Sequence, residues 1–380
     1  PKPQTPNPKP QIVAGNSKKC RHNFGPGELE KSEMSVMEED FEFDCRAEFK
    51  SLGFVSFMGM SFPVGVHLLA SRLPILVAML VLCLRREYNQ LGALIVGLFV
   101  LEFVFAYRPG LSEVAESLTR VYYSRGNLQR LGEEQSRVWL VTAVFSAASL
   151  LAAWAAGRVL LSAGAPEARL LVFALVGCGV LQNVSAVLRG FLLAERKGKR
   201  VVAVELTANA AAAGAAALLC GRGGSDGLRG AVAALYLRAA IEVSVFFGCA
   251  VLRGAKPSGV GKAARAVGTS SMKFLLEAAG AQVSLGFVFV FGSQVDLVVW
   301  GIAAELLGVG SSLPLGLALT ARAVIGQAAA ARNPKYFTRF WDKLFALGMF
   351  AVSGLAFAYF LMKRSLAELL FTKPEEISLL

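Results

Sequence analysis

Long apolar runs alternate with short basic segments along most of this sequence. A helix needs roughly 17–25 predominantly apolar residues to cross the hydrocarbon core of a bilayer. The second and eighth runs are long, and each holds an internal proline, Pro109 and Pro314, at which we expect a kink or a break. The alternation predicts an all-α integral membrane protein, a polytopic helical bundle with nine spans: 54–83, 90–119, 138–161, 169–188, 201–220, 230–252, 272–297, 298–330 and 344–362.

Residues 1–50 differ from the rest of the chain because they are polar, rich in proline and then acidic. A segment of this composition cannot bury enough apolar surface to fold alone. We therefore expect a disordered tail here, with no chemistry of its own.

The basic residues between the apolar runs predict the orientation in the membrane. Connections after the even-numbered spans carry, in or at their edges, 18 Lys and Arg residues, and the other connections carry six. Because Lys and Arg concentrate in cytoplasmic loops, the even-to-odd connections and the N-terminal tail are expected in the cytoplasm. The pattern leaves open whether this is the plasma membrane or an organelle membrane.

Composition excludes several other classes of protein. Only 17% of residues are charged, whereas soluble proteins average about 25%. The net charge of +12 does not indicate a nucleic-acid partner, because the basic residues form no separate domain. The sequence holds no glycine-rich phosphate loop, no HExxH and no nucleophile elbow, and Cys20, His22 and Cys45 lack a fourth metal ligand. We expect no enzyme activity, no metal and no cofactor.

A weak internal repeat favours two related bundles. The stretch "GLSEVAESLTRVYYSRGN" from Gly110 aligns with "GLALTARAVIGQAAAARN" from Gly316, and at the same offset the first two spans fall onto the seventh and eighth. Many transporters are built from repeats with the substrate site at the repeat interface. The repeat therefore points to a transport protein.

Ionisable residues inside membrane spans are rare and mark candidate functional sites. Glu277 lies about two turns into the seventh span, where it is either a partner of Lys273 or a protonatable carboxylate facing a cavity. Glu205 and Asn209 lie one turn apart on one face of the fifth span. They are either a functional pair or an interfacial glutamate beside an asparagine that bonds a neighbouring helix.

Three further polar residues are candidates for binding or coupling. His67 in the first span is either a core histidine or a member of a proton relay. Glu102 in the second span and Gln182 in the fourth are candidates of the same kind. Arg238 and Glu242 lie four residues apart in the sixth span, and this spacing predicts a structural ion pair.

Five stretches, in order, resemble motifs of the multidrug and toxic compound extrusion (MATE) family, especially its eukaryotic members. They correspond to the end of helix 2, the end of helix 4, helix 5, the start of helix 7 and helix 8 of that family: "GLSEVAESLTRVYYSRGNLQRLGEEQSR", "LRGFLLAERK", "LTANAAAAGAAAL", "MKFLLEAAGAQ" and "SSLPLGLALTARAVIGQAAAARNPK". The resemblance covers roughly residues 52–380, and the chain ends at a stretch resembling the segment before helix 10.

The resemblance implies a bundle of twelve helices in two six-helix lobes, of which about nine helices are expected here. One lobe would occupy residues 51–255 and a partial second lobe residues 256–380. It further implies a monomeric antiporter in the lipid bilayer, exporting small organic, mainly cationic solutes in exchange for H⁺ or Na⁺. Glu277 matches the family's glutamate in helix 7 and Asn209 its asparagine in helix 5, whereas Ala278 and Ala279 replace two tryptophans.

Two other functions remain open from the sequence. A flippase for lipid-linked sugars or another amphiphile, within the same superfamily, would need a wide and basic cavity. That hypothesis expects Arg72, Arg108 and Arg322 to line it. A non-transporting membrane scaffold is the third hypothesis, suggested by the small number of helices in the second lobe.

Overall fold

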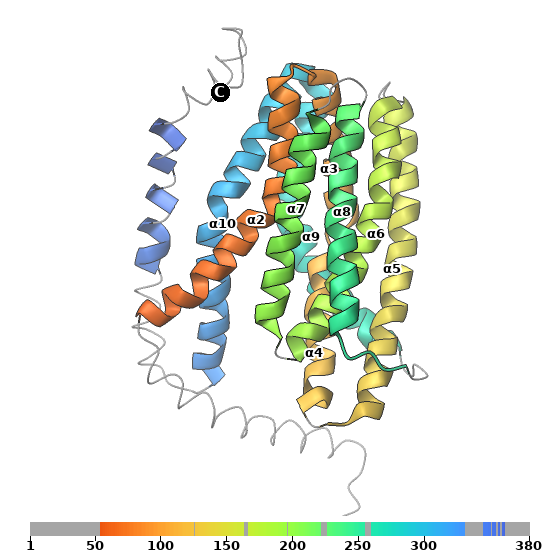
Figure 1. Cartoon of the computed structure of the whole chain (residues 1–380), viewed down its shortest axis with the longest axis vertical. Helices are drawn as coiled ribbons and strands as arrows, with labels where there is room; N and C mark the ends of the chain where they lie inside the picture. The colour runs from red at the N-terminus through yellow and green to blue at the C-terminus, as the bar shows by residue number, and fades with distance from the viewer. Residues whose placement is uncertain are drawn as a thin grey trace, which may run out of the picture.

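The computed structural model describes residues 54–361, apart from 125, 163–165, 196, 222–225, 255–259, 331–344, 351, 355 and 358. The described residues form helices packed side by side into one elongated bundle (Figure 1). The helices are α2 Phe54–Leu84, α3 Tyr88–Val104, α4 Arg108–Ser124, α5 Leu128–Ser162, α6 Pro166–Ala194, α7 Gly198–Cys220, α8 Asp226–Cys249, α9 Val260–Phe291 and α10 Gln294–Ala330.

Seven segments among the described residues are long and apolar enough to cross a membrane. They are Val64–Leu84, Tyr88–Arg120, Leu128–Val159, Arg169–Ala194, Gly198–Cys220, Gly227–Cys249 and Val295–Ala318. A shorter apolar helix follows at Phe345–Leu361, and the Tyr359 hydroxyl donates to the Leu306 carbonyl of α10. Seven of the nine predicted spans thus have a counterpart in order, the ninth matches the shorter helix, and the seventh has no candidate span.

The seventh predicted span differs from the structure at its start. We expected a span at 272–297 after a basic connection, but α9 already begins at Val260. Its first turns include Lys262 and Arg265, in an alanine-rich stretch that favours helix irrespective of hydropathy. The apolar pattern therefore marks only part of this helix, and α9 is not among the seven candidate spans.

The break expected at Pro109 is present. Residues 105–107 form a turn between α3 and α4, and Pro109 lies in the first turn of α4, where its missing N–H costs no helical hydrogen bond. Pro314, by contrast, lies inside α10, which continues through it.

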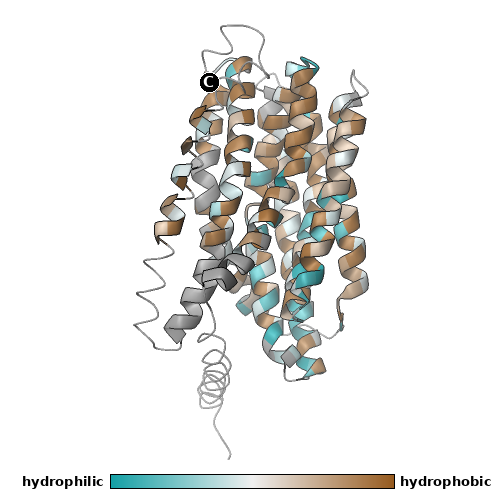
Figure 2. Cartoon of the chain, turned by 60° about the vertical axis from the view of Figure 1, so that its left-hand side comes forward, coloured by the Kyte–Doolittle hydropathy of each residue, from teal (hydrophilic) through white to brown (hydrophobic). Residues whose placement is uncertain are grey.

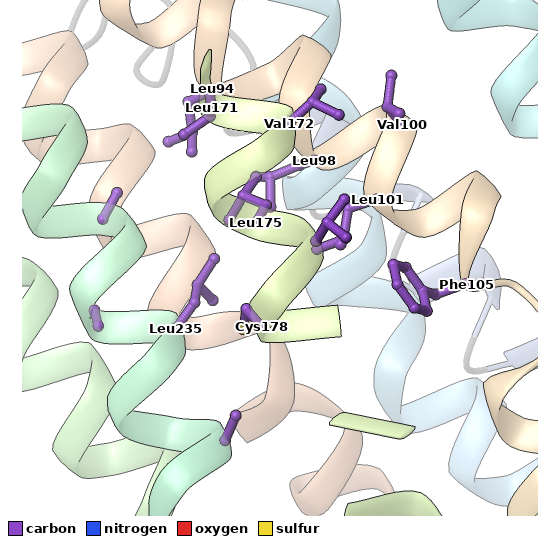
Figure 3. Packing of buried hydrophobic residues seen from close by; sticks show 14 of the residues in the cluster. Leu94, Leu98, Val100, Leu101, Phe105, Leu171, Val172, Leu175, Cys178 and Leu235 are labelled. Atoms are coloured by element: carbon purple, nitrogen blue, oxygen red, sulfur yellow. The ribbon is translucent and has the colours of Figure 1, made fainter. Parts of the chain in front are cut away.

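The core lies where α3, α6 and α8 meet (Figure 3). Leu94, Leu98 and Leu101 of α3 pack with Leu175 of α6 and Leu235 of α8, and all five are buried. Because lipid is as apolar as these side chains, close packing rather than water exclusion holds membrane helices together. The tightly packed face of α3 accordingly fixes the centre of the bundle.

Small residues let α7 approach its neighbours closely. Ala208, Ala212 and Ala216 recur every four residues, lie on one helix face, and have no exposed surface. This face packs against α8 and α2. Small side chains at such spacing are the usual means of bringing helix backbones together in membranes.

Helices far apart in the sequence meet at α2 and α10. The two cross obliquely and share the most extensive helix–helix contact of the described residues (Figure 1). A Cβ added to Gly316 would lie 2.5 Å from the backbone nitrogen of Gly65 and 2.6 Å from its Cα. Backbone therefore meets backbone at this crossing, with no side chain between.

We expect Gly316→Ala to destabilise the α2–α10 contact, because the added methyl group meets backbone that cannot move aside. Overpacking of this kind costs about 1–3 kcal/mol. The thermal midpoint of the purified protein in detergent measures it. Gly214→Ala is the matched control, since a Cβ there meets nothing within 4 Å. Equal midpoints for both variants would contradict the prediction.

Candidate functional site

Hydrophilic residues are sparse in these helices, and more of them lie toward the lower end of the bundle (Figure 2). Two groups of charged side chains lie inside it. One group, here called the charged cluster, joins α2, α6, α7 and α8. It comprises His67, Ser71, Ser185, Arg189, Glu205, Asn209, Arg238 and Glu242.

Glu205 is the centre of the charged cluster. His67 Nε2 lies 3.1 Å from Glu205 Oε2, and Arg189 Nη1 lies 3.3 Å from Glu205 Oε1. The His67 and Glu205 side chains are only 10% and 6% exposed. Glu205 Oε2 has no aligned hydrogen bond, so its contact with the imidazole is an ion pair only when His67 carries a proton. Imidazole and carboxylate are therefore held together away from solvent, and a single proton can reside on either.

Asn209 lies one turn after Glu205 on the same face of α7. Its Nδ2 donates to the Glu205 backbone carbonyl at 2.7 Å, and its side chain is fully buried. The Asn209 Oδ1 and the His67 Nδ1 make no hydrogen bond to another described protein group. Buried polar atoms without a partner are costly, and in native proteins they often mark a functional site.

A second ion pair flanks Glu205. Arg238 Nε donates to Glu242 Oε1 at 3.0 Å, and Nη1 of the same arginine donates to the Ser71 carbonyl at 3.1 Å. Ser185 Oγ donates to Glu242 Oε2 at 2.7 Å. The pairing predicted from the spacing is confirmed, and it links α8 to α2 and α6.

A neutral network ties the turn between α3 and α4 to the bundle. Asn183 Nδ2 donates to Tyr107 Oη at 2.8 Å and to Ser146 Oγ at 2.9 Å. Tyr107 Oη and Ser149 Oγ share a further bond of 2.8 Å. Gln182, the residue before Asn183, is also buried, but it lies outside the charged cluster.

The second charged group lines a cavity of about 540 Å³ between α2, α3, α9 and α10. Arg72 of α2 contacts Glu305 of α10 in the wall of this cavity, with Nη1 3.3 Å from both carboxylate oxygens. Glu102 is on the α3 wall. The remaining walls are mostly apolar and include Phe99 and Trp300.

The structure therefore brings three of the predicted residues together and separates others. His67, Glu205 and Asn209 lie in the charged cluster, whereas Glu102 lines the cavity. The backbone of Glu277 belongs to α9, but its side chain lies outside the described part of the structure.

Sequence reasoning missed two charged residues. Arg189 was assigned to a connection after the fourth span, although α6 continues to Ala194. Glu305 is the only acidic residue between positions 298 and 330, and that isolation is a signal that a search for ionisable residues in spans finds. Of the arginines expected in a flippase cavity, Arg72 lines it, Arg108 is not among its lining residues, and Arg322 lies outside the described side chains.

No group of three or more His, Cys, Asp or Glu in the described part of the chain is arranged to hold a metal ion. The chemistry that the charged cluster supports is instead the binding and release of protons. The cavity supports binding of a small molecule, because ligand sites combine apolar walls with a few polar groups.

The sequence matches no protein-family model, and no curated protein matches it significantly. The fold does have solved relatives. A multidrug resistance MATE family transporter of the MOP superfamily, in an inward-facing conformation, aligns with a TM-score of 0.68 at 15% identity over 81% of this chain and 75% of that one.

Two further solved structures have a similar fold. A MATE protein in the straight conformation has a TM-score of 0.62 at 16% identity, over 85% of this chain and 76% of that chain. A MOP superfamily transporter from Pyrococcus furiosus has a TM-score of 0.55 at 16% identity, over 83% and 76%.

The chain is therefore an all-α, multi-pass integral membrane protein, and its fold is one that transporters use. More particularly, the fold is that of the MATE transporters of the MOP superfamily, as the resemblance in the sequence motifs indicated.

Proposed function

We propose that this protein is a secondary active antiporter that moves small organic solutes, cations among them, out of the cytoplasm in exchange for protons. The cavity between α2, α3, α9 and α10 is the solute site, and the charged cluster couples solute movement to protons. The observation that carries the proposal is the buried His67–Glu205 pair in a bundle with the MATE fold.

The composition of the charged cluster favours protons over sodium ions. Hard cations prefer oxygen ligands, whereas Glu205 is approached by an imidazole nitrogen on one side and a guanidinium on the other. A proton on Glu205 removes a negative charge that His67 and Arg189 stabilise. Protonation thus weakens the contacts that join α7 to α2 and α6, and it supplies a two-state element for alternating access.

The proposal extends to the two lobes, the N-terminal tail and Glu277, where the resemblance to MATE transporters and the distribution of basic residues support it. Two lobes, with boundaries near residue 255, rock about the cavity of a monomeric transporter. The N-terminal tail lies in the cytoplasm, as the distribution of basic residues favours. Glu277 acts as a second protonatable carboxylate, with Lys273 as its neighbour one turn away.

Transport driven by a pH gradient tests the proposal. Purified protein in liposomes with an acidic interior should accumulate tetraethylammonium above its external concentration. An uncoupler that collapses the gradient should release it. Protein-free liposomes control for leak, and uptake that is the same with and without the gradient would contradict proton coupling.

Arg72 in the cavity wall favours one second candidate, a flippase for amphiphiles with an anionic headgroup. A flippase would move a fluorescent, anionic lipid-linked sugar between leaflets without a pH gradient. A membrane scaffold, the third hypothesis, would do neither, so the two assays together separate all three functions.

A further inference from the structure

Arg72 and Glu305 hold α2 and α10 together at the cavity wall. Both carboxylate oxygens of Glu305 lie 3.3 Å from Nη1 of Arg72, so a single guanidinium nitrogen is shared between them. Glu305 is therefore occupied by a cation that belongs to the protein itself.

The shape of α10 allows this arrangement. Gly308 lies nearly one turn after Glu305, and a Cβ built on it would be 3.1 Å from Cζ and Nη1 of Arg72 and 3.2 Å from its Nε. The guanidinium thus rests closely against the helix, and a side chain at this position would require it to shift by a few tenths of an ångström. Gly308 provides the space, and Glu305 provides the charge.

The exposed fractions of the two side chains differ. The Arg72 side chain is 40% exposed, whereas Glu305 is only 11% exposed. The carboxylate is therefore largely shielded, and the guanidinium is its more accessible partner. Among the described residues that line the cavity, the ionisable ones are these two and Glu102, which makes two carboxylates for one guanidinium.

We propose that Arg72 is a tethered cation that occupies Glu305 in place of a solute, and so sets the affinity of the cavity for organic cations. An incoming cation gains the Glu305 carboxylate only after Arg72 has moved away. Aromatic and aliphatic walls, among them Phe99, Trp300 and Leu285, bind the apolar part of such a solute. The inference rests on the proposed function only in taking this cavity as the solute site.

The direction of the effect follows from competition. A cation that binds Glu305 must first separate Arg72 from it, and this separation costs part of the binding energy. The cost disappears when Arg72 is replaced by a neutral residue. Each tenfold change in affinity corresponds to about 1.4 kcal/mol, which falls between the values typical of exposed ion pairs and those of close, desolvated pairs. Arg72→Gln should therefore bind organic cations about tenfold more tightly.

Equilibrium binding of tetraphenylphosphonium to the full chain in nanodiscs, without any gradient, tests the inference. Arg72→Gln should lower the dissociation constant about tenfold, whereas Arg72→Lys, which keeps a cation, should stay close to the unaltered protein. Arg158→Gln is the matched control, because that arginine lies over the Trp154 ring, outside the cavity. Unchanged or weaker binding by Arg72→Gln overturns the inference.

Two more variants separate competition from a general change in charge. Gly308→Ala keeps both charges but displaces the guanidinium, so it should increase affinity by a smaller factor. In a Glu305→Gln background, Arg72→Gln should bring no further gain, because the carboxylate for which the cations compete is gone. An equal gain in that background, or no binding by any folded variant, refutes the tethered-cation role.

The same assay distinguishes this inference from the proposed function. Binding without a gradient does not depend on proton coupling through the charged cluster. If gradient-driven transport fails but Arg72→Gln still gains affinity, the coupling proposal is wrong and the tethered cation stands. The reverse result leaves the antiporter and removes the role of Arg72.

Discussion

Replacing Glu205 by glutamine should abolish pH-driven accumulation of tetraethylammonium in liposomes while the protein remains folded and inserted. Glutamine has nearly the same shape and still offers an oxygen to Arg189, but it cannot bind or release a proton near neutral pH. The initial rate should fall roughly tenfold or more, since coupling between sites is typically worth 5–150-fold. Radiolabelled tetraethylammonium and an imposed pH gradient provide the measurement.

Exchange without a gradient serves as the internal control for this variant. Labelled tetraethylammonium should still exchange for unlabelled solute, because the cavity is intact and only the proton link is lost. Glu133→Gln is the matched control, since that carboxylate lies on α5, pairs with Arg130 at 3.2 Å, and is not part of the charged cluster. Full gradient-driven accumulation by Glu205→Gln would remove this residue from the mechanism.

Glu242→Leu should destabilise the protein more than any other single change considered so far. It leaves Arg238, whose side chain is 20% exposed, without its carboxylate inside the bundle. Removing one partner of a buried pair costs about 3–5 kcal/mol, because the remaining charge is uncompensated. The thermal midpoint in detergent and the yield of monodisperse protein should both fall clearly.

A double variant tests this reasoning. Arg238→Met combined with Glu242→Leu removes both charges, and apolar replacement of a buried pair is often neutral or stabilising. Stability should therefore return most of the way. Ser185→Ala removes only one hydrogen bond to the Glu242 carboxylate, which is worth about 1.5–3 kcal/mol, so its loss of stability should be smaller than that of Glu242→Leu. A double variant as unstable as Glu242→Leu would contradict the account.

The sequence was sufficient for the fold because hydropathy and helix length report directly on membrane spans. It also located the break before Pro109, since proline acts locally on its own helix. The early start of α9, at Val260 rather than 272, was missed for a related reason. Hydropathy detects only the apolar part of a helix. The first turns of α9 carry basic residues and are helical nevertheless.

The site was harder to predict because its contacts run between helices. Spacing along one helix gave the Arg238–Glu242 pair and the shared face of Glu205 and Asn209, and both hold in the structure. Spacing cannot show that His67 of α2 faces Glu205 of α7, because that contact depends on how the alanine face of α7 packs. The functional roles proposed for all six candidates stay predictions: Glu277, Asn209, Glu205, His67, Glu102 and Gln182.

The glycine contact between α2 and α10 makes the Arg72–Glu305 pair sensitive to the angle between these helices. Glu305 lies roughly 16 Å along α10 from Gly316, at about 1.5 Å per residue. With that contact as the fulcrum, a rotation of α10 by about 10° moves Glu305 by about 3 Å. That displacement is comparable to the 3.3 Å that now separates the two side chains. A small change in the tilt of α10 about the glycine contact is therefore enough to break the Arg72–Glu305 ion pair.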